Sequence, residues 1–107
     1  ASSLLRKTSL PILSMLDLLT EMLPKGAEIR NAKETASRFK FDFVYDGKVS
    51  KGNMFKTCAP GREKRFITQE IASHMAAILL ENGDLSGAKM WLNASSTGDM
   101  PSEEEKK

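Results

Sequence analysis

The sequence predicts a small, mainly α-helical domain of about four helices, and three observations support this prediction. A broad apolar helical pattern covers residues 9–23, and a second apolar seam with helical spacing covers 28–45. Two further helical patterns fill 67–82 and 85–94. Because 107 residues can bury one hydrophobic core but not two, we expect a single helical domain over residues 9–94.

The first predicted helix lies in "SLPILSMLDLLTEMLPKG". Ser9 can cap its start and Pro11 is tolerated in its first turn, whereas Pro24 and Gly26 end it. Beyond the first turn only four of its residues are polar: Ser14, Asp17, Thr20 and Glu21. So broad an apolar arc is typical of a helix packed on more than one side, either in a bundle core or in the groove of a partner.

The segment from 28 to 45 carries two competing patterns. Some apolar residues step by three and four positions, as on one face of a helix: Ile29, Ala32, Ala36, Phe39 and Phe43. Rings also occupy every second position before an Asp-Gly turn, as in a strand: Phe39, Phe41, Phe43 and Tyr45. That β-hairpin, over 39–55, would pair Phe39 with Met54, Val44 with Val49 and Asp42 with Lys51. Since Gly52 would interrupt its second strand, we expect the helix and keep the hairpin as the alternative.

The structure of the remaining segments is predicted from the glycines and prolines that interrupt helices and strands and from the residues that can cap helices. Residues 48–66 contain two glycines, a proline and five basic residues after Lys48, which predicts a long basic loop. The stretch "ITQEIASHMAAILLENGDLSGAKMWLNASS" then predicts an αα-hairpin, with Thr68 and Asp84 as caps and Gly83 ending the first helix. Residues 1–8 are predicted to be flexible, and 95–107 to form a disordered acidic and polar tail.

The composition narrows the class of protein. Hydrophobic residues make up 40% of the chain and charged residues 28%, which is typical of a globular domain. The net charge of +2 is too small to attract nucleic acid or anionic lipid by itself. The apolar run from Leu10 to Leu23 is shorter than the roughly 20 residues of a membrane span, so none is expected. Cys58 is the only cysteine, which fits an intracellular, cytoplasmic or nuclear, location.

Residue types that carry catalysis are scarce. His74 is the only histidine, and it falls between Ile71 and Ile78, where a core histidine is expected rather than a base or a ligand. Cys58 has basic neighbours, but the sequence offers no base to activate its thiol. Glycine-rich phosphate loops, calcium loops and zinc-binding helices have no match. We therefore expect no enzymatic activity, no cofactor and no metal.

The stretch from Arg38 to Arg65 is a local anomaly in charge. It contains eight basic and three acidic residues, interleaved with five aromatic rings. Cations that neutralise phosphates beside rings that stack on bases bind single-stranded nucleic acid without reading its sequence. The competing interpretation is a solvated basic loop above an aromatic core. The candidate binding residues are Arg38, Lys40, Phe41, Tyr45, Lys48, Lys51, Lys56, Arg62, Lys64 and Arg65.

The order of the predicted helices carries a resemblance to a known family. The matching stretches are "LPILSMLDLLTEMLP", "NAKETASRFKFDFVYDGKVS" and "ITQEIASHMAAILLENGDLSGAKMWL". Together they resemble the C-terminal helical domain shared by the steroid receptor RNA activator protein and the large outer-coat subunit of COPII vesicles. Residues 51–66 depart from that pattern as an insertion, and the acidic tail replaces the family's final helix. The resemblance implies a non-enzymatic helical interaction module, in vesicle coat assembly or in transcriptional coregulation.

The sequence thus predicts a protein–protein interaction domain of a larger protein, working as an adaptor or scaffold. An apolar helical surface would provide affinity, and the basic segment would steer an acidic protein partner toward it. The alternative is an accessory domain that binds single-stranded DNA or RNA. In that alternative the basic candidates contact phosphates, and Phe41 or Tyr45 stacks on a base.

Overall fold

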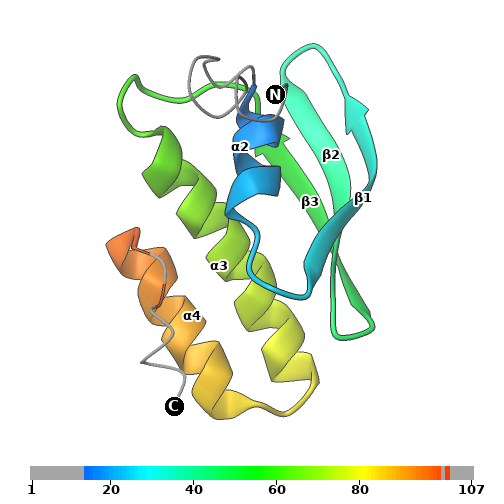
Figure 1. Cartoon of the computed structure of the whole chain (residues 1–107), viewed down its shortest axis with the longest axis vertical. Coiled ribbons are helices and arrows are strands. Elements are labelled where there is room, and N and C mark those ends of the chain that lie inside the picture. The colour runs from blue at the N-terminus through cyan, green and yellow to red at the C-terminus, as the bar shows by residue number, and fades with distance from the viewer. Residues whose placement is uncertain (1–13, 100, 102–107) are drawn as a thin grey trace, which may run out of the picture.

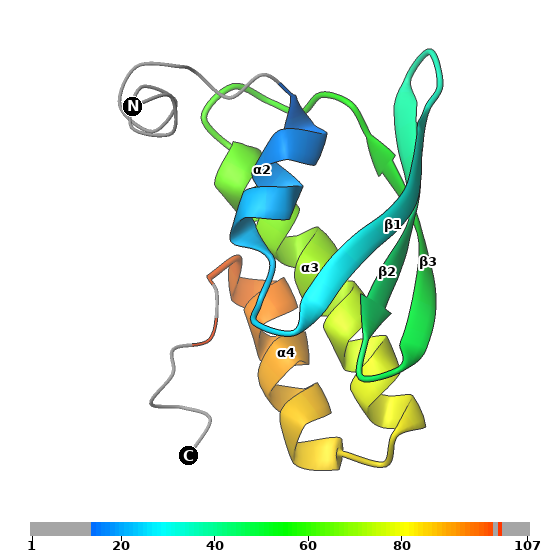
Figure 2. The ribbon, with the colours of Figure 1, turned by 45° about the vertical axis from the view of Figure 1, so that its right-hand side comes forward.

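The structure, a computed structural model, describes residues 14–99 and Pro101. Its elements follow in the order α2 (Met15–Met22), β1 (Ala27–Glu34), β2 (Arg38–Tyr45), β3 (Lys48–Phe55), α3 (Glu63–Glu81) and α4 (Leu85–Thr97). The strands form an antiparallel sheet in the order β1-β2-β3, and the helices gather on one of its faces (Figures 1 and 2). Helix α3 packs against the sheet, and α4 packs on α3 from the other side.

The prediction of a mainly α-helical four-helix domain is therefore wrong. Within the described residues, three helices cover a three-stranded sheet, which is an α+β fold. The error lies in residues 28–55, where the expected second helix and much of the basic loop are strands. The helical fold implied by the family resemblance is corrected for the same reason, because its second matching stretch forms β1 and β2.

The alternation of rings decides the structure of β2. Phe39, Phe41 and Phe43 point into the core, with Phe43 fully buried, while Arg38 and Lys40 point to the outer face. The following turn has positive φ at both Asp46 and Gly47, as a tight two-residue hairpin requires. The β2–β3 register contains the three pairs of the alternative prediction: Phe39 with Met54, Val44 with Val49 and Asp42 with Lys51. The hairpin alternative is thus confirmed.

The presence of Gly52 made a strand look unfavourable, but the packing of the core requires a glycine at this position. The glycine lies opposite Phe41 in the register, and the ring of Phe41 covers it. A Cβ at position 52 would overlap three atoms of that ring. A glycine inside a strand marks such a close approach, so the missing side chain of β3 is replaced by an aromatic ring of β2.

Strand β1 is one of the two edge strands of the sheet, and most of its residues are exposed. Its pairing with β2 shifts between Arg30 and Lys33, where Asn31 has a positive φ of 54°. The Asn31 amide donates a hydrogen bond of 2.8 Å to the Asp42 carboxylate. Of the residues that suggested a helical seam here, Ile29 is half-buried, whereas Ala32 and Ala36 are exposed.

The helix boundaries differ from the predictions mainly at their starts. Ser14 caps α2, accepting a hydrogen bond of 3.1 Å from the Asp17 amide; residues 9–13 lie outside the described part, as do 1–8. Helix α3 begins at Glu63, so Thr68 is a buried helix residue and not a cap. Asp84 caps α4 as predicted, through the Gly87 amide at 2.9 Å. Helix α4 continues to Thr97, three residues into the expected tail, and residues 100 and 102–107 are not described.

A polar network joins the sheet to α3 inside this core. The His74 ring stacks on Phe43, with their centroids 5.1 Å apart. Its Nδ1 lies 2.6 Å from the Ser50 hydroxyl oxygen, and its Nε2 lies 3.0 Å from the Glu70 carboxylate. The core position predicted for His74 is confirmed, since only 8% of the residue is exposed.

We expect Gly52→Ala to lower the free energy of unfolding by about 1–3 kcal/mol, because the added methyl group displaces the Phe41 ring. Urea denaturation measures this difference. Asn53→Ala, at the next position of β3 and exposed on the outer face, is the control and should change stability by less than about 0.5 kcal/mol. Equal stability of the two variants would contradict the packing of Phe41 on Gly52.

Candidate polyanion-binding surface

The structure divides the aromatic members of the predicted site from the basic ones. Phe41 is 3% exposed and covers Gly52, so it is not available to stack on a base. Tyr45 is half-buried at the far end of β2, where it lines a cleft with Trp91. Stacking of a single strand on Phe41 or Tyr45, as the sequence suggested, has no support in this geometry.

Most of the basic candidates gather at one end of the molecule. The β1–β2 loop, the β3–α3 loop and the start of α3 all lie at this end, beside the start of α2 (Figure 1). We call it the basic end; its cations are Lys33, Arg38, Lys40, Lys56, Arg62, Lys64 and Arg65, and its carboxylates are Asp17, Glu34, Glu63 and Asp99. Lys48 belongs to the opposite end, beside the Asp46-Gly47 turn. The basic end therefore carries a surplus of positive charge in a chain of nearly neutral net charge.

Three of the cations at the basic end make contacts within the protein that help to hold the fold together. Lys56 forms an ion pair with Glu34 and donates a hydrogen bond of 3.1 Å to the Thr35 carbonyl, which holds the β1–β2 loop against β3. Arg65 lies across the end of α4, where a Cβ on Gly98 would come within 2.6 Å of its Cγ. The Arg38 guanidinium covers the ring of Phe55 at 4.4 Å.

The other four cations are exposed: Lys33, Lys40, Arg62 and Lys64. Within the described residues none of them has an ion-pair partner. Lys33 and Lys40 lie directly opposite each other across β1 and β2, and like charges in that position destabilise a sheet. Arg62 stands at the start of α3, whose first amides have no side-chain cap. An anion at Lys33 and Lys40 would relieve their repulsion, and one at Arg62 would meet the positive end of a 19-residue helix.

Lys51 is neutralised locally and contributes little to this surface. Its ammonium group lies 2.8 Å from the Asp42 carboxylate on the outer face of the sheet. Hydrogen bonds from Lys51 and from Asn31 lower the pKa of Asp42, so this carboxylate stays charged through the neutral range. Lys33 was not among the binding residues predicted from the sequence. Only the strand register shows that it lies opposite Lys40, which was predicted.

Ser50, His74 and Glu70 are the residue types of a hydrolytic triad. In this structure they form a partly buried network between β3 and α3. The ring is held between β3 and α3 and also meets the edge of Phe41, with centroids 5.7 Å apart. Three cavities of the described structure are lined by other residues. The acid contacts Nε2 and the serine Nδ1, so the ring has the opposite orientation to that of a serine protease triad.

Cys58 also lacks the surroundings of a reactive thiol. Burial raises its pKa, and the nearby Glu63 carboxylate raises it further, so the thiolate is disfavoured. No group of acidic, histidine or cysteine residues within the described part could hold a metal ion. None of the described helices has the length and apolar character needed to span a bilayer.

Comparison with protein families, with curated protein sequences and with solved structures finds no match to this chain.

We expect Ser50→Ala to destabilise the protein by about 1–3 kcal/mol, since it leaves a buried nitrogen of His74 without a partner. Combining it with His74→Phe should cost less than the sum of the two single changes, because the phenyl ring has no nitrogen to satisfy. Thermal or urea unfolding of the three variants measures this coupling. Additive losses would show that the hydrogen bond to Ser50 does not stabilise the fold.

Proposed function

We propose that this domain binds the sugar–phosphate backbone of a nucleic-acid duplex through its basic end, without catalysis and without reading sequence. The observation that carries this proposal is the convergence of cations from three separate segments, including the opposed Lys33 and Lys40, at one end of the fold. Phosphate contacts position a protein on nucleic acid but carry no sequence information. No base-reading element is needed for such a role.

A duplex fits this surface better than a single strand. Proteins that grip single strands place successive bases on several aromatic rings, whereas double-stranded RNA is recognised by its shape and its backbone. Among the described aromatic residues only Phe55 is largely exposed, at 52%, and the Arg38 guanidinium lies over its ring. One partly covered ring does not make a stacking platform.

The rigidity of the surface supports the same proposal. Lys40 stands on β2 and Lys64 on α3, so the two cations are held by regular elements and not by a flexible loop. The β1–β2 loop is tied back to β3 by a hydrogen bond of 3.0 Å from the Lys56 amide to the Ser37 carbonyl. Cations held at fixed positions on the sheet and on α3 suit the regular spacing of phosphates along a nucleic-acid duplex.

The test is a titration of the protein with a mixed-sequence RNA duplex of about 20 base pairs, longer than the roughly 16 base pairs that a small duplex-binding domain spans. We expect Lys40→Gln/Lys64→Gln to weaken binding to every sequence alike. The slope of log affinity against log salt should fall by about two, because two phosphate contacts are lost. Fluorescence anisotropy at several salt concentrations measures both quantities.

The matched control is Lys48→Gln/Lys89→Gln, which removes the same charge from exposed lysines outside the basic end. It should leave the affinity and the salt slope nearly unchanged. Equal losses in the two double variants would mean that only net charge matters. A single strand of the same length that binds as tightly as the duplex would overturn the choice of a duplex.

A further inference from the structure

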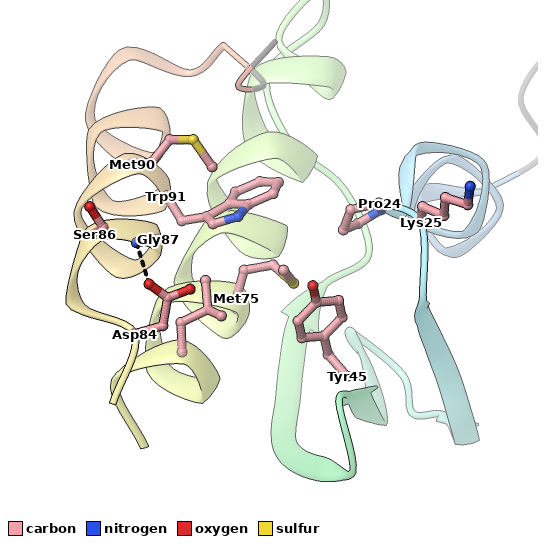
Figure 3. Close-up of a pocket in the computed structure, with 10 residues that line it drawn as sticks. Pro24, Lys25, Tyr45, Met75, Asp84, Ser86, Gly87, Met90 and Trp91 are labelled. Atoms are coloured by element: carbon pink, nitrogen blue, oxygen red, sulfur yellow. Dashed lines mark hydrogen bonds between the residues drawn. The ribbon is translucent and has the colours of Figure 1, made fainter. Parts of the chain in front are cut away.

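A second surface, separate from the basic end, is a cleft of about 360 Å³ between α4 and the α2–β1 connection (Figure 3). Six of its ten lining residues are apolar or aromatic: Pro24, Tyr45, Met75, Leu79, Met90 and Trp91. Four of its polar or small lining residues come from the rim: Lys25, Asp84, Ser86 and Gly87. The sequence signals missed this cleft, because it is assembled from segments that are far apart in the chain.

The floor and walls suit a long flexible side chain. Trp91 lines the cleft although only 3% of the residue is exposed. Met75 lies between this ring and Tyr45, whose hydroxyl points into the opening (Figure 3). Thioethers adapt to the shape of what they contact, and aromatic faces attract cations.

The carboxylate of Asp84 supplies the charge of the cleft. Its Oδ1 accepts the capping hydrogen bond from Gly87, whereas Oδ2 has no hydrogen-bond or ion-pair partner within the described residues. A Cβ at position 87 would lie 2.6 Å from Oδ2, so the glycine leaves the room in which this oxygen sits. Glycine in a helix costs about 0.5–1 kcal/mol relative to alanine, and here it keeps the carboxylate in place.

Asp84 caps the positive N-terminus of α4, but two negative groups also lie near it. The C-terminus of α3 adjoins it and has no basic residue in its last turn. The Asp46 carboxylate is held beside the same turn by the Asn82 amide at 3.0 Å. Lys25 lies at the opposite rim, and its ammonium group points away from Asp84 (Figure 3).

We propose that this cleft binds a lysine or arginine side chain presented by a partner protein. The aliphatic stem of the side chain would lie against Met75, Leu79 and the Trp91 ring, and its charged head would reach the Asp84 carboxylate and the Tyr45 hydroxyl. The Asp84 carboxylate favours a basic anchor over the other classes. A leucine or phenylalanine would bury the carboxylate without a counter-charge, and a glutamate would be repelled by it.

This surface goes beyond the proposed nucleic-acid binding and uses none of its residues. It also changes the protein partner expected from the sequence, since the cleft selects a basic segment and not an acidic one. The proposed surface is a cleft between α3, α4 and the end of β2, whereas the sequence predicted an apolar helical surface.

The test uses four capped pentapeptides in which arginine, lysine, leucine or glutamate stands between glycines. We expect the arginine and lysine peptides to cause saturable chemical-shift changes at the Trp91 indole and the Gly87 amide. The leucine and glutamate peptides should cause none. Asp84→Asn should weaken the arginine peptide at least fivefold, and because asparagine also caps helices, α4 should keep its fold.

Glu81→Gln is the matched control: it removes one negative charge from an exposed position near the same turn and should retain at least half of the affinity. The proposal is overturned if the basic peptides cause no saturable change, if leucine or glutamate binds as well, or if Asp84→Asn binds as the unmodified protein does. Duplex binding should be the same in both variants, so failure at this cleft is distinguishable from failure at the basic end.

Discussion

The packing of the aromatic face of β2 on α3 is the constraint on which the rest of the structure depends. Phe43 is fully buried and stacks on His74, while Phe41 fills the space that Gly52 leaves on the neighbouring strand. Rings of this size contribute more buried apolar area than other core residues. Once they face α3, the orientation of the sheet relative to the helices is determined, and so is the face that remains open to solvent.

The same alternation builds the basic end. A strand whose odd positions are buried must expose its even positions, so Arg38 and Lys40 project from the outer face. The hairpin geometry then brings Lys33 opposite Lys40 and places Lys56 beside the β1–β2 loop. Charge that is spread along the sequence is thereby concentrated in space, and this concentration is what the proposed duplex binding requires.

The two proposed surfaces have opposite charge and lie at separate places on the fold. The basic end suits a polyanion, and the cleft at Asp84 suits a cationic side chain. Partners of opposite charge do not compete for one surface, so a basic protein and a nucleic acid can occupy the domain together. If both proposals hold, the domain would work as an adaptor, which is the class predicted from the sequence, with a different surface and a protein partner of opposite charge.

Much of the local structure could be predicted from the sequence. Asp84 and Gly83 mark the turn of the helical hairpin through their own backbone and side-chain preferences, which need no distant contact. The strand register was also readable, because Asp46-Gly47 sets it locally. The choice between helix and strand was not, since Phe39 and Phe43 satisfy both periods.

The sequence by itself determined the Asp84 cap, the tight turn and the excess of cations between Arg38 and Arg65. The tertiary structure decided that the rings of β2 are core, because only the ring of Phe41 above Gly52 makes a glycine favourable inside a strand. It also decided which cations remain exposed and assembled the cleft of Tyr45 and Trp91. These outcomes depend on contacts between residues distant in sequence, which no local pattern encodes.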